Sequence, residues 1–134
     1  MHECQINAQG AKSEDKSIEG ELPVLHDSGE RQQFNTGAVR DPAKGKGRYD
    51  LISPHALKRL ALHYEAGAEK YADRNWEKGI PMSRCFSSAV RHLFQWLAGM
   101  RNEDHLAAAA WNVFAIMHFE AVKPGMMDIE GVGK

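Results

Sequence analysis

Three amphipathic segments between residues 53 and 120 constrain the fold of this chain more than any other feature. In each segment, apolar side chains recur every three or four residues, which is the period of an α-helix. No part of the second half alternates with the period of two that is typical of a strand. The pattern therefore predicts an all-α fold. The residues that we predict to face its core include Leu57, Leu60, Tyr64, Phe86, Ala89, Leu93, Leu97, Val113, Phe114 and Met117.

Residues at the ends of the first two segments are typical of helix boundaries. Ser53 suits an N-cap and Pro54 suits the first helical position, so the first helix is predicted to begin there. Its end is predicted before residues 73–75, because residues 78–81 form a clear stop signal. The second helix is predicted over about residues 83–98.

The third helix is predicted to start near Asn102, because asparagine is a favourable N-cap. Glu103 and Asp104 would then lie in its first turn, where carboxylates complement the helix dipole. The alanines at 107–110 permit close helix packing, and residues 123–125 are predicted to end the helix. Three helices are too few to cover all their apolar surface, so we expect a helical bundle that is completed by oligomerisation.

The first part of the chain shows no helical stripe. Residues 1–36 are polar and mixed in charge, and we predict a flexible arm there. Residues 37–50 form a basic, glycine-rich loop that opens the predicted domain, residues 37–134. The chain of 134 residues is long enough for one domain with one core.

Charge and hydropathy argue against several classes of protein. The formal net charge is −1, so no general basic field recruits nucleic acid, and no apolar run reaches the length of a membrane span. The chain begins without the apolar stretch of a signal peptide, so we expect a cytoplasmic protein. One alternative is a small nucleic-acid-binding module that uses Arg40, Lys44, Lys46 and Arg48, against which the net charge argues.

Glu65 and Glu69 are the first candidates for chemistry. Their spacing puts both carboxylates on one face of the first helix, one turn apart, where like charges repel. A divalent cation such as Mg²⁺, which takes oxygen ligands, would relieve this repulsion. The alternative is a solvated helix face with Lys58, Arg59 or Lys70 nearby.

Asn112 is a polar residue in an otherwise apolar run. It lies two turns beyond Asp104 and nearly on the same face of the third helix. A buried asparagine needs hydrogen-bond partners. We therefore expect Asn112 either to bond to a neighbouring helix or to contact a ligand.

The histidines lack the spacing of a zinc site. No HxxxH pair occurs among His63, His92, His105 and His118. Because they lie on separate segments, we expect hydrogen bonds at the surface or between helices, and no zinc site. Arg91 and His92 are adjacent and would place two nitrogen-rich side chains together.

Four sequence motifs occur in order between residues 44 and 112: KGKGRYDLISP (44–54), LHYEAGAEKYADRNWEKGIP (62–81), SAVRHLFQWLAG (88–99) and EDHLAAAAWN (103–112). In these motifs the chain resembles the phage dATP/dGTP diphosphohydrolases, a MazG-like family. Within this family it resembles the MazZ branch, from cyanophages that replace adenine with 2-aminoadenine in their DNA. The resemblance implies an all-α pyrophosphohydrolase in the cytoplasm of an infected host cell, one that cuts a nucleoside triphosphate between its α and β phosphates.

The resemblance also implies a metal site. MazG-like enzymes hold Mg²⁺ or Mn²⁺ with the pattern EExxE on one helix and ExxD on a later one. Glu65 and Glu69 keep a pair of acids from the first pattern, with Ala66 in the place of the middle acid, while Asp104 and Asn112 stand in for the second. By resemblance, Glu65, Glu69 and Asp104 are catalytic and bind two or three ions, with Asn112 as a further ligand.

The loop before the first helix is a predicted phosphate-binding element, made of Lys44, Lys46, Arg48 and Tyr49. Its glycines let backbone N–H groups approach a phosphate, and a guanidinium grips phosphate with two parallel hydrogen bonds. At about 1.5 Å per residue, Ser53 to Glu65 spans about 18 Å. We therefore expect the loop to serve the site of a neighbouring subunit; the alternative is a solvated basic loop.

The remaining predicted substrate contacts lie in the helical part. Lys70, Arg91 and His92 are expected near the phosphates, and Asn75 and Trp76 near the base. The alternative for Trp76 is a hydrophobic plug at a helix end.

Two functions are consistent with these features. The first is metal-dependent hydrolysis of a purine nucleoside triphosphate, with dGTP favoured over GTP or dATP, by a dimer or tetramer. The monophosphate product would feed the synthesis of a modified purine nucleotide in the phage. The second is a catalytically inactive nucleotide-binding or assembly protein on the same helical frame.

Overall fold

A computed structural model describes residues 22–132 of the chain, which divides after Gly47 into two compact units. In the first unit, β1 (Gln32–Gln33) pairs antiparallel with β2 (Val39–Arg40). The strands lie on either side of the boundary expected between residues 36 and 37. Residues 1–21 of the expected arm lie outside the described part of the chain.

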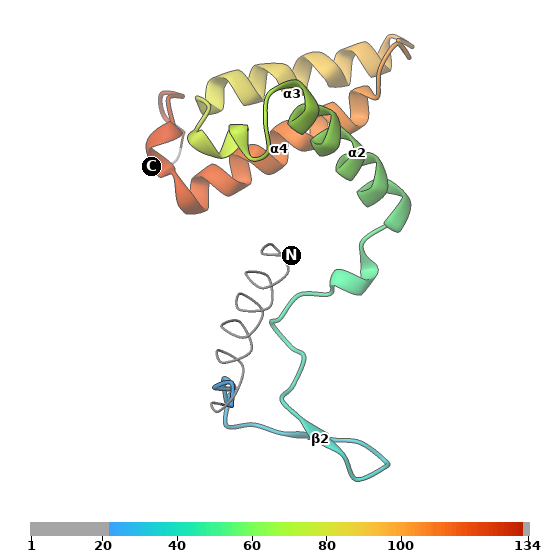
Figure 1. The fold of residues 1–134 in the computed structure, drawn as a ribbon, viewed down its shortest axis with the longest axis vertical. Coiled ribbons are helices and arrows are strands. Elements are labelled where there is room, and N and C mark those ends of the chain that lie inside the picture. The colour runs from blue at the N-terminus through green and yellow to red at the C-terminus, as the bar shows by residue number, and fades with distance from the viewer. Residues whose placement is uncertain (1–21, 133–134) are drawn as a thin grey trace, which may run out of the picture. The chain divides into compact units, whose positions relative to one another are not determined.

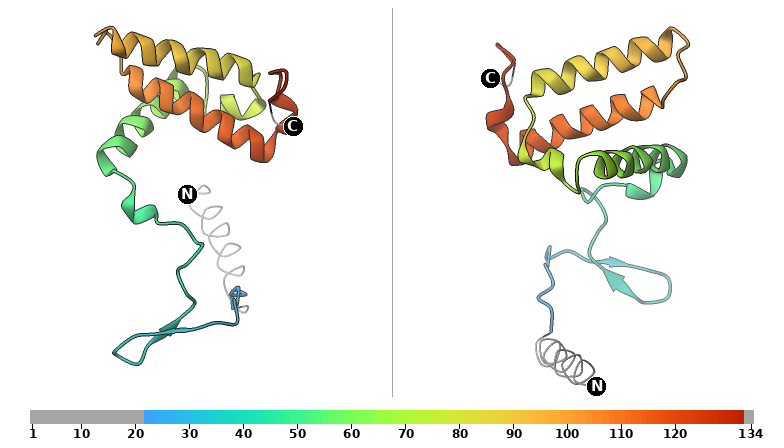
Figure 2. Two further views of the ribbon diagram at one scale, coloured as in Figure 1. Left: turned by 180° about the vertical axis from the view of Figure 1, so that it is seen from behind. Right: turned by 45° about the horizontal axis from the view of Figure 1, so that its top comes forward.

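The second unit is all-α, as the periodicity predicts. Its elements are η1 (Tyr49–Leu51), α2 (Pro54–Lys70), η2 (Asn75–Lys78), α3 (Met82–Leu97), α4 (His105–Val122) and η3 (Pro124–Met126). α3 and α4 lie side by side, and α2 packs against α4 (Figures 1 and 2). None of the helices in residues 22–132 combines the length and the apolar character needed to cross a membrane.

The boundaries of α2 and α4 follow from their caps. Ser53 caps α2 as predicted, because its side chain accepts a hydrogen bond from the Ala56 N–H at 3.2 Å. The prediction that Asn102 caps the third helix is wrong. α4 begins at His105 and is capped by Asp104, whose carboxylate accepts from the Ala107 N–H at 3.1 Å. The reason is that a carboxylate one residue before the helix reaches the free N–H groups of its first turn.

The buried core of the second unit lies between α3 and α4. Met82, Cys85, Ala115 and Phe119 form a cluster in which each side chain is almost fully buried. The partly buried apolar residues packed around this cluster are Trp76, Ile80, Trp111, Ile116, Met126 and Met127. Residues of η2, α3, α4 and the segment up to Met127 therefore share one core.

Much of the predicted core face is exposed. Leu60 and Ala89 are buried, but large side chains of the same stripes are exposed: Leu57, Phe86, Leu93, Leu97, Val113, Phe114 and Met117. The face of α4 that is buried consists largely of alanine, including residues 107–109, as the expectation of close helix packing requires. Small side chains bring the helices together and leave the large apolar ones outside, where a second chain can cover them.

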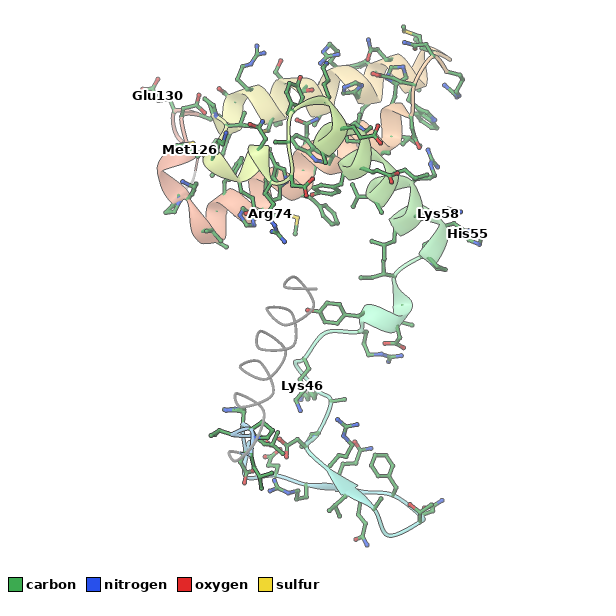
Figure 3. The ribbon with its side chains drawn as sticks, in the orientation of Figure 1. Lys46, His55, Lys58, Arg74, Met126 and Glu130 are labelled. Atoms are coloured by element: carbon green, nitrogen blue, oxygen red, sulfur yellow. The ribbon has the colours of Figure 1, made fainter. Side chains whose placement is uncertain are left out.

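The turn between α2 and α3 is held by the C-terminal residues. Gly79 has a φ of 112°, and a Cβ at this position would lie 2.8 Å from Met126 Sδ. The Ser83 N–H donates to Asp128 Oδ1 at 2.8 Å, at the start of α3. Met126 and Arg74, the latter on the turn itself, are labelled in Figure 3. These contacts fix η2 beside the cavity described next.

Candidate functional site

A groove of about 1190 Å³ is lined by residues of α2, η2, α3 and α4. Seven of the residues predicted from the sequence line it: Lys70, Asn75, Trp76, Arg91, His92, Asp104 and Asn112. The groove therefore gathers most of the helical part of the predicted site, although those residues are spread over more than forty positions of the chain.

Cationic side chains from α2, α3 and the turn between them line this groove: Arg59, Lys70, Arg74, Arg84 and Arg91. Acidic side chains also line it: Asp73, Glu77, Glu103 and Asp104. Arg74 has a φ of 59°, a conformation that residues other than glycine rarely adopt, and its Nη1 donates to Glu77 Oε1 at 2.7 Å. Arg84 and Arg91 form no ion pair with a described residue, so their guanidinium groups are available to an anion that enters the groove.

Trp76 belongs both to the groove and to the core. Its ring is half-buried and lies 4.7 Å from that of His118, 6.0 Å from that of Tyr64 and 6.3 Å from that of Trp111, as centroid distances. The hydrophobic-plug interpretation of Trp76 is thus supported by its packing. Because Trp76, Tyr64 and Trp111 also line the groove, they give it an aromatic wall on which a flat ring can pack.

Asp104 forms a two-pronged ion pair with Arg59. Oδ2 accepts from Nε and Oδ1 from Nη2, both at 2.7 Å, so that the start of α4 is tied to α2. The Arg59 guanidinium, with help from the Ala107 N–H, lowers the pKa of Asp104 to about 2. Asp104 lines the groove as an ionised carboxylate, but one already paired with a cation.

Glu65 and Glu69 are exposed on α2 and are not among the residues that line the groove. Neither carboxylate forms an ion pair within residues 22–132. Of the cations considered as their partners, Arg59 binds Asp104, and the Lys70 ammonium lies 5.2 Å from the ring centroid of Tyr71. The structure therefore puts Asp104 and Asn112 at the groove and the glutamate pair outside it.

Asn112 is buried and makes the hydrogen bond between helices that was one of its two interpretations. Its Nδ2 donates to Ser88 Oγ on α3 at 3.3 Å and to the Ala108 carbonyl at 2.8 Å. Arg91 Nη2 donates to the same Ser88 oxygen at 3.1 Å. Ser88 thus links Asn112 and Arg91 on the wall of the groove.

His92 and His105 form a buried pair between α3 and α4, as the expectation of hydrogen bonds between helices requires. Their Nδ1 atoms lie 3.0 Å apart, and Glu103 Oε1 lies 3.3 Å from the first and 3.4 Å from the second. Burial, more than the neighbouring Arg91, lowers the pKa of His92. The sequence spacing puts His92 and His105 on separate segments and does not predict that they meet. They are in contact because the turn after α3 brings together residues thirteen positions apart.

The predicted phosphate loop is divided between the two units. Lys44 and Lys46 belong to the first unit, and Arg48 and Tyr49 to the second, and all four are exposed. Arg48 Nη2 lies 2.6 Å from Asp50 Oδ2 in an ion pair. Gly45 and Gly47, which flank Lys46, both have a φ of 85°, which glycine adopts at little cost.

Several residues of the groove were not singled out from the sequence as site residues. Arg59 and His63 share a face of α2 with Lys70, and Arg84 and Ser88 share a face of α3 with Arg91. These residues could have been predicted from the sequence, because each lies at a helical spacing from Lys70 or Arg91. Glu103, and His105 that it contacts, had no such signal, because their position depends on the turn between two helices.

Comparison with known proteins gives one match. The family model described as dATP/dGTP diphosphohydrolase, N-terminal, matches residues 36–129, which is well over half of the chain. No curated protein and no solved structure matches the chain. The match covers all of the second unit up to residue 129, including every residue that lines the groove. This chain therefore belongs to the family of the dATP/dGTP diphosphohydrolase N-terminal domain.

Proposed function

We propose that this protein hydrolyses a purine nucleoside triphosphate, preferentially dGTP, with dATP or GTP as further candidates, to the monophosphate and pyrophosphate. The observation that carries the proposal is the groove, which combines guanidinium groups with an aromatic wall. A triphosphate needs cationic donors, and a purine base packs on flat apolar faces. A volume of about 1190 Å³ accommodates a ligand of nucleotide size. Membership of the diphosphohydrolase family supports this class of substrate.

Each side of the groove has a distinct part in the proposal. Lys70 and Arg91, from α2 and α3, neutralise the phosphates, and His92 lies beside Arg91 at the same wall. Asn75 and Trp76, from η2, hold the base, with the amide as a hydrogen-bonding group and the indole as a stacking face. Binding in this orientation fixes the triphosphate towards α3.

Mg²⁺ or Mn²⁺, two or three ions per site, is the proposed cofactor. Glu65 and Glu69 fit it, because both are exposed carboxylates one turn apart and free of ion pairs with described residues. Asp104 and Asn112 are the further proposed ligands, with Asp104 available once a substrate oxygen replaces it at Arg59. The bound cation would neutralise triphosphate charge and lower the pKa of the attacking water.

The proposal includes an oligomer, a dimer or tetramer, in which sites are shared. Exposed apolar side chains on α3 and α4 are the surface that such an assembly would cover. Because the glutamate pair lies outside the groove of its own chain, a contact between subunits is also the proposed means of completing the site. The loop residues Lys44, Lys46, Arg48 and Tyr49 would then bind phosphate in a neighbouring subunit.

The similarity to MazZ suggests a role for the product. A dGTP pyrophosphohydrolase yields dGMP, which phages with 2-aminoadenine in their DNA would use to make the modified purine nucleotide. The setting proposed is the cytoplasm of the infected cell, with no nucleic-acid or membrane partner.

A second candidate function is nucleotide binding without hydrolysis. The ion pair between Arg59 and Asp104, and the position of Glu65 and Glu69 outside the groove, favour it. A protein of this kind would retain the groove but would lack an assembled metal site.

A panel of nucleotides separates the two functions. The full-length protein is incubated with each dNTP and NTP in the presence of Mg²⁺ or Mn²⁺, and the products are identified by chromatography. Release of dGMP and pyrophosphate from dGTP, abolished by EDTA, is the expected result. Binding of dGTP by calorimetry without any product would instead favour the inactive binding protein.

A further inference from the structure

His92, Glu103 and His105 place three potential metal-binding atoms around one point. His92 comes from the second half of α3, His105 is the first residue of α4, and Glu103 lies on the turn between them. The two imidazoles are buried, whereas the Glu103 side chain is 52% exposed. Two rigid helices thus fix the nitrogen atoms, and the turn supplies the oxygen from the solvent side.

The hydrogen bond from His105 to Asn102 determines which nitrogen is free. Asn102 Oδ1 lies 2.9 Å from His105 Nε2, and a carbonyl oxygen can only accept, so this bond needs a proton on Nε2. In the neutral ring, Nδ1 then carries the lone pair, and this is the atom that faces His92 and Glu103. A histidine that donates its distal N–H to a carbonyl oxygen has the arrangement found around metal-ligating histidines.

The separations of the three atoms fit a single small cation. Nδ1 to Nδ1 is 3.0 Å, and Glu103 Oε1 is 3.3 Å and 3.4 Å from the two nitrogens. A triangle of these sides has a point about 2.0 Å from all three corners and slightly out of their plane, and about 2.0 Å is the usual distance from Zn²⁺ to histidine nitrogen or carboxylate oxygen. The three atoms therefore match one face of a tetrahedron.

The three residues of this cluster border open space. Glu103 lines the large groove and also a smaller neighbouring pocket of about 440 Å³, and His105 lines the smaller pocket. His92 lines the large groove. A water molecule or a ligand oxygen can therefore reach the point that the three donors surround.

We propose that His92, His105 and Glu103 form a binding site for one divalent transition-metal ion of the Zn²⁺ type, with a fourth position open to the groove. Two imidazole nitrogens select a transition metal over Mg²⁺, which prefers oxygen ligands, so the site is distinct from the one proposed at Glu65 and Glu69. Before the ion binds, His92 Nδ1 donates its proton to His105 Nδ1. When the ion binds, that proton leaves Nδ1 and a proton is taken up on Nε2, so His92 changes tautomer and remains neutral. The inference goes beyond the proposed hydrolysis and does not depend on it.

Cobalt binding tests the site directly. The full-length protein is stripped with a chelator and titrated with Co²⁺ without nucleotide, and the visible absorption bands are recorded. The expected result is one ion per chain with the intense bands of four-coordinate Co²⁺, displaced by Zn²⁺ and unaffected by excess Mg²⁺. Absence of a saturable ion, or the weak bands of six-coordinate Co²⁺, overturns the proposal.

Exposed residues supply variants that leave the helices intact. Asn102→Ala removes the hydrogen-bond partner of His105 and should lower the Co²⁺ affinity about 10–100-fold, as for other partners of metal-ligating histidines. Glu103→Gln removes the charge of a ligand and should lower the affinity further. Glu120→Gln and His55→Gln are the matched controls, since both residues are exposed and lie outside the cluster. Binding that is equal in all four variants shows that the ion is held elsewhere in the chain and overturns the proposal.

Circular dichroism of the metal-free variants checks that each is folded. Hydrolysis of dGTP with Mg²⁺ is measured separately on the stripped protein. If the unmodified protein hydrolyses dGTP but binds no saturable Co²⁺, the metal-site proposal alone fails. If it binds Co²⁺ but does not hydrolyse dGTP, the proposed hydrolysis alone fails.

Discussion

Asp104 performs two tasks with one carboxylate. It caps α4 through the Ala107 N–H and binds the Arg59 guanidinium of α2. Its neighbour Glu103 points its carboxylate at the buried His92 and His105 instead. Two adjacent acids therefore stabilise different contacts, because only Asp104 stands at the cap position where it reaches the free N–H groups of the helix.

The pH dependence of stability should report the ion pair of Asp104. Its folded pKa of about 2 is below the ordinary aspartate value, so its contribution is present above about pH 4 and is lost as pH falls towards 2. Asp104→Asn keeps a capping side chain but removes the charge. Urea unfolding between pH 6 and about pH 2 should show a smaller loss of stability in the variant over the lower part of that range. Equal losses would show that the ion pair contributes nothing.

Glu69→Gln tests the carboxylate pair on α2. The change preserves size and removes one charge, so hydrolysis of dGTP with Mg²⁺ should fall by orders of magnitude while circular dichroism is unchanged. Glu120→Gln, at an exposed position on α4, is the control and should retain activity. A normal rate for Glu69→Gln would show that this pair does not hold the catalytic metal.

The elements around the groove are joined by turns rather than by a continuous core. α2 contributes one buried residue, Leu60, whereas α3 and α4 share most of the buried surface. The turn through η2 connects α2 to α3, and Gly79 in this turn lies close to the Met126 side chain. The geometry of the groove thus depends on a turn that the C-terminal residues hold in place.

Two glycine substitutions should have opposite effects on stability. Gly79→Ala introduces a Cβ at a φ of 112° and 2.8 Å from Met126 Sδ, so it should lower the free energy of unfolding by about 1 kcal/mol or more. Gly67→Ala lies inside α2 with no atom within 4 Å of the new Cβ, and should raise it by about 0.5–1 kcal/mol. Urea denaturation measures both. The same sign for both variants would contradict the role of the turn.

At the scale of the whole molecule, the apolar outer surface of α3 and α4 stands out. Phe94 is 65% exposed and Leu97 is 71% exposed, and other large apolar residues of the two helices are exposed near half of their area. Such a surface is more extensive than scattered apolar residues on a monomer. A second copy of the chain is the partner that the proposed function calls for.

Phe94→Glu should disrupt the proposed oligomer. A charge at the centre of an apolar interface would lose its hydration on association, so the variant should have the mass of a monomer in light scattering at micromolar concentration. His55→Glu is the control, because His55 is also exposed but lies on α2. Figure 3 shows His55 at the N-terminal part of that helix. A wild-type protein that is itself monomeric would contradict the assembly.

Complementation between variants tests whether sites are shared. Arg48→Ala should raise the KM for dGTP strongly and leave the oligomer intact, because it removes a phosphate-binding guanidinium from an exposed position. When Arg48→Ala subunits are mixed with Glu69→Gln subunits, activity should return if one site uses residues of two chains. Unchanged steady-state kinetics for Arg48→Ala would exclude a role of the loop.

Local sequence determined the helices of this protein. Periodic apolar residues, the Ser53–Pro54 cap and the stop at residues 78–81 depend on neighbours within a few positions, so α2 and α3 lie where they were predicted. Lys70, Asn75, Trp76 and Arg91, which are predicted from the sequence to contact the substrate, all line the groove.

Tertiary structure decided which face of each helix is buried and which side chains meet. The alanine face of α4 allows a closer approach than the face with large residues, so Phe114 and Met117 remain exposed although their spacing is that of a core. The turn after α3 joins His92 to His105, and the packing of α2 joins Arg59 to Asp104, over separations that no sequence period spans. These contacts depend on how whole helices pack, which is a property of surfaces and not of any one stretch of sequence.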